Sequence, residues 1–352
     1  MSLLQRAKKE GRRFLNPVPT MVGGPNLLLK VIPLYLNNRE ERVPKLALGP
    51  FRTDAAIYDR PAESGLRITW MGHSSTLVEI DGVRVLIDPV WDKRASPVQW
   101  AGPKRFFAPP MRLEELPQLD AVLISHDHYD HLGAGTVQRL AELQPRARWV
   151  TSLGVGRILQ QLGVSAERIA ELDWTEAVAV VGESGARCEI TSLPSRHFSG
   201  RGAFNRFETL WGSFVLRGAA ASAGDTPGHA VFYGADSGWW DGFAEIGAKY
   251  GPFDLTMLEI GAWNELWQSI HLGPDGAARA FQKLNAAEDE TPQGLLMPIH
   301  WGLFDLALHA WRQPILRMLE LAEAGGLKLW SPEPGVPSEV VRGVEMRSDW
   351  WR

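Results

Sequence analysis

One segment of the chain concentrates side chains that can bind metal ions. Residues 126–131 read His-Asp-His-Tyr-Asp-His, so three of the nine histidines fall within six residues, with two aspartates among them. Neutral imidazole nitrogens and carboxylate oxygens are ligands that a borderline ion such as Zn²⁺ accepts. The alternative is a solvated polar loop that happens to be rich in histidine, but a clustered ligand motif is far more specific than background. The segment therefore predicts metal ligands at His126, His128, Asp130 and His131.

Three further candidate ligands are scattered along the chain. His197, Asp236 and His300 each stand just beyond the C-terminal end of a strand-like apolar run. Sheets in α/β proteins place their ligand sites at these strand ends. Each residue alone would more often be an ordinary polar residue at the end of a strand. Together with residues 126–131 they supply seven ligands, which is enough for two metal ions.

The seven residues divide into two sets. We expect His126, His128 and His197 to bind one ion and Asp130, His131 and His300 the other, with Asp236 as a bridge. Two adjacent divalent ions make hydroxide available at neutral pH and hold the oxygens of a substrate. Two such ions, two carboxylates and one hydroxide leave a net charge of about +1, which favours a phosphodiester monoanion over a neutral lactone or amide. Zn²⁺ is the expected metal, with Fe or Mn as alternatives.

The rest of the sequence predicts the elements that hold these ligands. Apolar and alternating runs predict strands at residues 68–70, 76–80, 83–88, 121–125, 149–152, 188–193, 213–216, 230–233, 255–260 and 295–298. Helical spacing predicts helices at residues 135–143, 155–162, 274–285 and 313–324. Asp81-Gly82 is a hairpin turn signal. A hairpin followed by strands that alternate with helices indicates a layered α/β domain.

Length and composition limit the remaining possibilities. The 352 residues, 45% of them hydrophobic, can form an N-terminal extension (1–66) and one large domain (67–352). A net charge of −4 gives no electrostatic footprint for nucleic-acid binding, which usually needs a basic stripe. The single cysteine, Cys188, excludes an intrachain disulfide and favours a reducing compartment. We find no secretory signal and no apolar stretch near the about 20 residues of a membrane span, so we expect a cytoplasmic protein.

The ligand pattern resembles that of the metallo-β-lactamase superfamily. The motif His126-x-His128-x-Asp130-His131, followed by isolated His197, Asp236 and His300, carries this resemblance. It implies an α/β fold, the αββα sandwich, with the dinuclear site at one edge between the sheets. It also implies that Asp88 orients the ligands as a supporting carboxylate; the alternative is a plain turn residue before Pro89.

Longer stretches resemble the N-acylphosphatidylethanolamine-hydrolysing phospholipase D family. They include Phe14-Leu-Asn-Pro-Val-Pro-Thr20, Gly72-His73, Arg94-Ala-Ser-Pro97, Gly102-Pro-Lys-Arg-Phe106, Asp120 to His131, Leu210-Trp-Gly-Ser213, Gly251-Pro-Phe-Asp254 and Ile299-His-Trp-Gly302. The similarity departs around residues 199–208 and 264–271, which would shape a substrate pocket. It implies a phosphodiesterase that cleaves N-acylphosphatidylethanolamine-like lipids to N-acylethanolamine and phosphatidic acid. A lactonase or thioesterase using the same metals, and a non-enzymatic metal-binding protein, are the alternatives.

The resemblance also suggests roles for residues around the metals. It places His271 at the substrate or its leaving group, and Asp130 orients the nucleophile. Tyr129, His73 and His309 are further candidates for substrate contact. Five tryptophans either line an apolar pocket for acyl chains or pack in the core: Trp239, Trp240, Trp263, Trp267 and Trp301.

The N-terminal apolar run and the partners leave further alternatives open. The run Leu27–Leu36 either covers the core, which we favour, or lies on a bilayer as a peripheral membrane contact. The expected partner is a phospholipid or another phosphodiester. A homodimer and a monomer are both compatible with the sequence.

Overall fold

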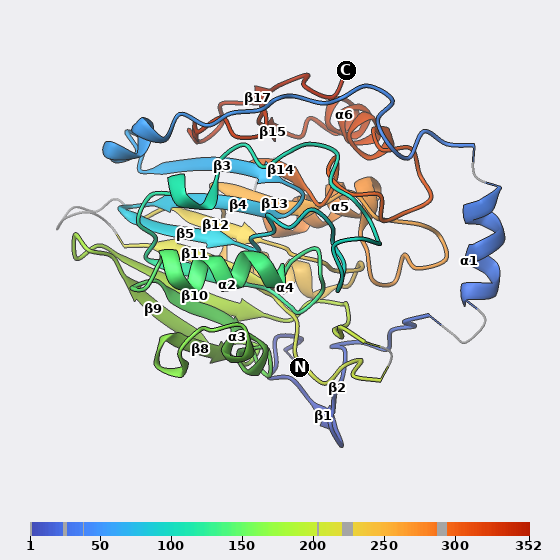
Figure 1. The fold of residues 1–352 in the computed structure, drawn as a ribbon, viewed down its shortest axis with the longest axis horizontal. Helices are drawn as coiled ribbons and strands as arrows, with labels where there is room; N and C mark the ends of the chain where they lie inside the picture. The colour runs from blue at the N-terminus through green and yellow to red at the C-terminus, as the bar shows by residue number, and fades with distance from the viewer. Residues whose placement is uncertain (1, 24–26, 38, 203, 220–227, 287–293) are drawn as a thin grey trace.

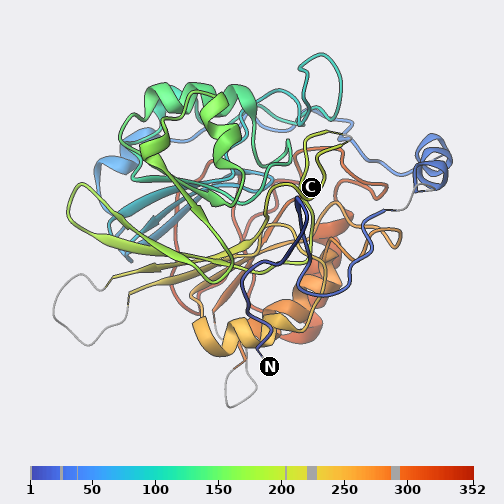
Figure 2. The same cartoon turned by 90° about the horizontal axis from the view of Figure 1, so that it is seen from below.

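Two facing β-sheets form the centre of the molecule, and helices cover their outer faces (Figures 1 and 2). The computed structural model describes residues 2–23, 27–37, 39–202, 204–219, 228–286 and 294–352. In Figure 2, helices α2 (Ala134–Leu143) and α3 (Gly156–Gln161) lie on one side of the sheets. Helices α4 (Gly242–Tyr250), α5 (Gly273–Leu284) and α6 (Gln313–Gly325) lie on the other. This arrangement confirms the predicted αββα sandwich.

The first sheet has seven strands in the order β16-β3-β4-β5-β6-β7-β8. Their bounds are β3 Leu66–Gly72, β4 Ser75–Ile80, β5 Val83–Ile87, β6 Ala121–Ile124, β7 Arg148–Ser152, β8 Ile169–Leu172 and β16 Ser338–Glu339. Strands β5 to β8 run parallel, whereas β16, β3, β4 and β5 pair antiparallel. The hairpin of β4 and β5 pairs Ile80 with Val83 across Asp81 and Gly82, so the predicted turn is confirmed.

The second sheet has six strands in the order β14-β13-β12-β11-β10-β9. Their bounds are β9 Ala177–Val181, β10 Arg187–Leu193, β11 Ser213–Gly218, β12 Ala230–Tyr233, β13 Leu255–Glu259 and β14 Leu295–Ile299. Strands β12, β13 and β14 are parallel, and the others pair antiparallel. Two-stranded pairs outside the sheets join β1 (Lys9–Glu10) to β2 (Arg13–Phe14) and β15 (Trp330–Ser331) to β17 (Met346–Arg347).

Apolar side chains on both faces of the first sheet explain the layered packing. In β4, Val78 and Ile80 point into the core between the sheets, whereas Leu77 points to the layer of α2 and α3. Successive side chains of a strand lie on opposite faces, so a strand that is buried on both sides needs a nearly continuous apolar run. Cys188 is fully buried in β10.

Every predicted strand and helix is present with bounds within two residues of those expected. The predictions did not include β8, β9 and α4. Strand β9 is a continuous apolar run, Ala177-Val-Ala-Val-Val181, that the predictions passed over, and it is only partly buried. Helix α4 is short and contains two glycines, which are poor helix formers.

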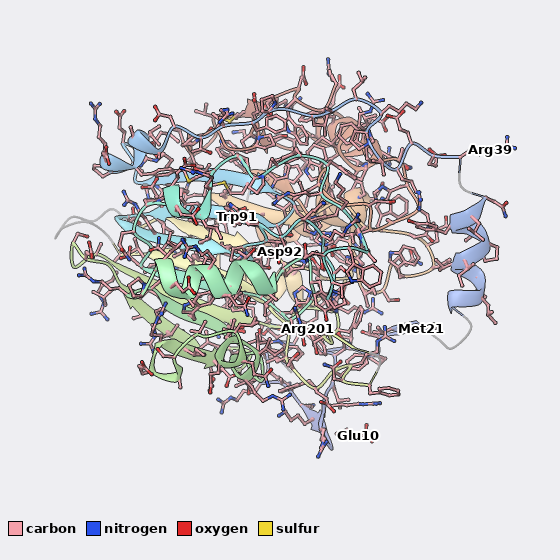
Figure 3. The ribbon with its side chains drawn as sticks, viewed as in Figure 1. Glu10, Met21, Arg39, Trp91, Asp92 and Arg201 are labelled. Atoms are coloured by element: carbon pink, nitrogen blue, oxygen red, sulfur yellow. The ribbon has the colours of Figure 1, made fainter. Side chains whose placement is uncertain are left out.

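The N-terminal run predicted to cover the core instead forms helix α1 (Leu27–Leu36) at the edge of the molecule, between Met21 and Arg39 (Figures 1 and 3). The side chains of Leu29 and Leu36 are 71% and 77% exposed, so the prediction that this run packs in the core is wrong. Among the described residues, no helix is long and apolar enough to cross a bilayer.

Candidate metal centre

The seven predicted ligands converge at one edge of the sandwich. His126 follows β6 of the first sheet, and His197, Asp236 and His300 follow strands β10, β12 and β14 of the second. The segment 126–131 lies between β6 and α2. The C-terminal ends of strands from both sheets therefore bring together residues that are far apart in the sequence.

The first group consists of three histidines and one carboxylate. The Nδ1 atom of His128 lies 2.9 Å from His126 Nε2 and 3.3 Å from His197 Nε2. Asp236 Oδ2 lies 3.5 Å from His197 Nε2 and 3.8 Å from His126 Nε2. Ligands on a tetrahedral zinc ion with bonds of about 2.0–2.1 Å lie about 3.3 Å apart. The spacing of this group matches that requirement.

The second group shares Asp236. Its Oδ1 lies 3.2 Å from both His131 Nε2 and His300 Nε2. Asp130 Oδ2 lies 3.2 Å from His300 Nε2 and 3.6 Å from His131 Nε2. The two oxygens of Asp236 thus face two different pairs of imidazoles, which is the arrangement of a bridging carboxylate.

Unpartnered polar atoms provide an independent test of whether these residues suit a metal. His131 Nε2 and Asp236 Oδ1 are buried and lie 3.2 Å apart, but neither makes a well-oriented hydrogen bond to a described residue. A buried polar atom without a partner carries a desolvation cost of about 1–3 kcal/mol. A cation between these atoms would remove that cost, so the composition and spacing of the ligand set suit a pair of divalent ions.

In two of the ligand histidines, the ring nitrogen that faces away from the metal centre lies within hydrogen-bond distance of an oxygen. Asp88 Oδ2 lies 2.7 Å from His131 Nδ1, and Asp88 Oδ1 accepts the Ser125 backbone N–H at 2.7 Å. His197 Nδ1 lies 2.8 Å from the Ile270 carbonyl oxygen, and Asn16 donates to the His197 carbonyl at 2.8 Å. Such contacts fix the orientation of a ligand ring and the nitrogen that faces the metal.

The backbone around the centre is strained. Five non-glycine residues at strand ends here have positive φ angles: His73 (55°), Asp88 (39°), Ala235 (46°), Ala262 (56°) and His300 (62°). Side chains with a Cβ atom rarely adopt this region, and such residues gather at functional sites. The strain sets the direction in which the ligand loops leave the strands.

The ionisable groups of the centre influence one another strongly. Burial and the neighbouring His131 and His128 hold the pKa of His126 well below its usual value. Burial would lower the pKa of His300 as well, but the charge of Asp236 raises it to about 10. Burial would raise the pKa of Asp236, but His131 and His300 lower it well below its usual value. Protons on these imidazoles balance the carboxylates, and a bound cation would displace them.

A cavity of about 260 Å³ opens onto the centre. Four of the predicted ligands, His128, Asp130, Asp236 and His300, line it together with His271. Its walls are largely apolar: Val22, Phe198, Trp267, Ile270 and Leu306. Among the described residues that line this cavity, Arg206 provides the one guanidinium group. It lies 4.8 Å from the centre of the Phe198 ring.

The other predicted contact residues lie outside this cavity. His73 Nε2 is 3.1 Å from Asp130 Oδ2, and His73, His300 and His309 line a separate space of about 20 Å³. The Tyr129 hydroxyl donates to the Arg201 carbonyl at 3.0 Å, and the Arg201 guanidinium lies 3.9 Å from the centre of the Tyr129 ring. Their placement does not support direct substrate contact for His73, Tyr129 or His309.

The five candidate tryptophans mostly serve other purposes. Trp267 lines the cavity. Trp240 and Trp301 are buried in the core between the layers, and Trp239 is covered by Arg279 at 3.6 Å. Trp263 lines a different surface groove. The pocket interpretation therefore applies to one of the five.

Glu259 is a residue of the centre that the sequence analysis missed. It is fully buried at the end of β13, and its Oε2 lies 2.5 Å from His271 Nδ1. Burial raises the pKa of Glu259. Burial would lower the pKa of His271, but the charge of Glu259 raises it. The available signal was a carboxylate at the end of an otherwise apolar strand.

Comparison with known proteins finds a family and relatives that are similar to this chain in sequence. The family described as the beta-lactamase superfamily domain matches residues 83–301. An uncharacterized protein of Mycobacterium tuberculosis is 44% identical over 289 residues, covering 82% of this chain and 72% of the relative. N-acyl-phosphatidylethanolamine-hydrolyzing phospholipase D 1 of Caenorhabditis elegans is 36% identical over 273 residues, covering 76% of this chain and 72% of the relative.

Solved structures show the same fold. Igni18, a metallo hydrolase from the archaeon Ignicoccus hospitalis, superposes with a TM-score of 0.54 at 21% identity, covering 78% of this chain and 97% of that one. An isothiocyanate hydrolase from Delia radicum gut bacteria gives a TM-score of 0.55 at 17% identity, covering 77% and 98%. At these identities the likeness supports the fold alone.

Proposed function

This chain belongs to the metallo-β-lactamase superfamily and is a metal-dependent hydrolase, and on that basis we propose that it is a dinuclear phosphodiesterase of N-acylphosphatidylethanolamine-like phospholipids. The observation that carries the dinuclear assignment is the placement of Asp236. Its Oδ1 is 3.2 Å from His131 Nε2, and its Oδ2 is 3.5 Å from His197 Nε2. A carboxylate that divides its oxygens in this way supports two ions rather than one.

The ligands and the residues around them have separate roles in this proposal. Three histidines and Asp236 would hold one ion, and Asp130, His131, His300 and Asp236 the other. Bound there, the ions would lower the pKa of a shared water and hold the oxygens of the phosphodiester. Asp130 and His271 both line the cavity. In this proposal Asp130 would orient the attacking water, and His271 would contact the leaving group. Attack on phosphorus breaks the bond to the N-acylethanolamine oxygen.

The shape and charge of the cavity favour an amphiphilic anion. Its apolar walls offer contacts to acyl chains, and four of the predicted metal ligands also line it. The relative from C. elegans carries an N-acylphosphatidylethanolamine-hydrolysing activity in its name. Binding energy from the acyl chains would help to place phosphorus over the metals. A long-chain lipid should therefore have a higher kcat/KM than a short diester.

Helix α1 supports a peripheral contact with the lipid surface. Its exposed side chains include Leu29, Ile32 and Leu36. Val22, just before this helix, lines the cavity. A helix that lays apolar side chains on a bilayer would hold the mouth of the cavity near its substrate.

A substrate panel tests the assignment. Purified protein is given N-acylphosphatidylethanolamine in mixed micelles, bis(4-nitrophenyl) phosphate, a long-chain lactone and an acyl thioester. We expect kcat/KM for the lipid to exceed that for the soluble diester by about tenfold or more. In H₂¹⁸O, the label should enter phosphatidic acid rather than N-acylethanolamine. Faster turnover of the lactone or thioester would instead assign the chain to carbonyl hydrolysis.

A further inference from the structure

We propose that Glu259 is a positioning residue that holds the His271 ring so that its Nε2 atom faces the substrate. This inference rests on the hydrolase function proposed above and concerns a residue that does not itself touch the substrate. It follows from the contacts of Glu259, the contacts of His271, and the position of Glu259 beside the His300 ring.

The carboxylate of Glu259 is immobilised by hydrogen bonds on both oxygens. Its Oε1 accepts the backbone N–H groups of Ser237 at 2.8 Å and Leu272 at 3.1 Å. Its Oε2 lies 2.5 Å from His271 Nδ1. A buried carboxylate without partners would be costly, and here every contact has a defined direction. The side chain is thus a rigid support at the end of β13.

Glu259 lies next to the Nδ1 side of the His300 ring. Its Oε2 is 3.9 Å from His300 Nδ1. The other nitrogen of that ring, Nε2, faces Asp130 and Asp236 at 3.2 Å. Glu259 thus contacts the His300 ring at the nitrogen other than the one that faces Asp130 and Asp236. Ligand atoms of Asp236, Glu259, His271 and His300 also lie within 4.8 Å of one another, so the metal content of a Glu259 variant separates a positioning residue from a metal ligand.

His271 has one ring nitrogen committed and one available. Its ring centre lies 5.1 Å from that of His197 and 5.4 Å from that of His300. The side chain is 12% exposed and lines the cavity. Because Nδ1 is held by Glu259, Nε2 is the nitrogen that a bound substrate meets. A carboxylate that fixes the tautomer and direction of an imidazole is a general device for presenting one nitrogen to a reaction.

The substitution Glu259→Gln tests this role sharply. The backbone N–H groups of Ser237 and Leu272 require an oxygen at the Oε1 position, so the new amide NH₂ must face His271 Nδ1. The NH₂ group donates, which forces Nδ1 to accept and inverts the tautomer of His271. We expect kcat to fall by about 10- to 100-fold, with KM and metal content little changed.

Two measurements separate positioning from other roles. In ¹H–¹⁵N spectra of the metal-free protein, the downfield Nδ1–H signal of His271 should vanish in Glu259→Gln and in His271→Ala. In kinetics with bis(4-nitrophenyl) phosphate, the double variant should be no slower than His271→Ala alone. Asp81→Asn is the matched control. Asp81 Oδ1 lies 2.7 Å from His229 Nδ1, and this pair is outside the metal centre. It should remove the His229 signal and leave kcat unchanged.

Several outcomes would overturn the proposal. Loss of an ion from Glu259→Gln would show that Glu259 is a metal ligand. If the losses of kcat in the two single variants multiply in the double variant, Glu259 acts independently of His271. If Glu259→Gln does not fold, Glu259→Asp keeps the charge but shortens the side chain, and an unchanged His271 signal and kcat in that variant would also exclude positioning. The spectra and the assay with the soluble diester do not use lipid. Failure of the lipid assignment can therefore be told apart from failure of this proposal.

Discussion

Asp236 joins the two groups of ligands, since its Oδ1 faces His131 and His300 while its Oδ2 faces His126 and His197. Asp236→Asn should lower kcat by at least about 100-fold, because a neutral amide cannot bridge two cations. Elemental analysis should show loss of at least one ion with an unchanged circular dichroism spectrum.

The control for this substitution is Asp254→Asn, which changes a buried carboxylate at the start of β13. Asp254 accepts the Ala230 backbone N–H at 2.8 Å and is far from the ligands in the sheet. It should reduce stability and leave activity per bound metal intact. Activity of Asp236→Asn within several-fold of the unmodified protein would show that the bridge is misassigned.

Asp88 shows how a residue without a place in the cavity supports the centre. Its two oxygens receive the Ser125 N–H, the Ser125 hydroxyl, the Tyr233 hydroxyl and His131 Nδ1. In Asp88→Asn only one oxygen remains to accept these hydrogen bonds. The new NH₂ group would face groups that themselves donate a hydrogen. We expect metal affinity to fall by about 10- to 100-fold, measured by competition with a chelating dye. Unchanged affinity would limit Asp88 to a structural role.

At the scale of elements, helix α1 can be tested apart from catalysis. Leu29→Glu with Leu36→Glu places two charges on side chains that are 71% and 77% exposed. We expect weaker sedimentation with phospholipid vesicles and slower cleavage of vesicle lipid, with hydrolysis of a soluble diester unchanged. Val181→Glu, at a 57% exposed position of β9, is the control and should leave vesicle binding intact. Equal loss of lipid and soluble activities would argue against membrane contact.

The β4–β5 turn is tied to the start of β12 by a histidine. Asp81 lies 2.7 Å from His229 Nδ1, and this hydrogen bond raises the pKa of His229 above its ordinary value. A raised folded-state pKa stabilises the protein fully below the unfolded value of about 6.5 and loses that effect as pH rises through the folded value. The loss of stability in His229→Gln, measured by urea unfolding, should therefore be largest near pH 6 and vanish at alkaline pH. A difference that is independent of pH would contradict this link.

The whole molecule should depend on its metals for stability as well as activity. We expect two ions per chain, because one oxygen of Asp236 faces His126 and His197 and the other faces His131 and His300. Ions that bind only the folded state stabilise it, by about 4 kcal/mol at a free concentration roughly 1,000 times Kd. A chelator should therefore lower Tm, and Zn²⁺, Mn²⁺ or Fe²⁺ should restore it. Fewer than one ion per chain, with no gain on reconstitution, would contradict the dinuclear assignment.

Much of the architecture was predictable from local patterns. Asp81-Gly82 predicted the hairpin of β4 and β5, and the apolar runs predicted the strands that end at the candidate ligands. These features depend on neighbours within a few residues, which the sequence displays directly. Glycine-containing α4 lacked such a local pattern and was missed, whereas β9 was missed although Ala177–Val181 is a continuous apolar run.

The set of chemistry-bearing residues was determined by the sequence alone, because a cluster such as His126-Asp-His-Tyr-Asp-His131 needs no tertiary information to indicate metal binding. Only the tertiary structure decided which other side chains lie around these ligands. Glu259 and His271 are brought together by the end of β13 and the loop after it, and of five tryptophans only Trp267 reaches the cavity. Such contacts depend on the order of strands in a sheet and on loop directions. These are set by packing across the whole molecule rather than by spacing along the chain.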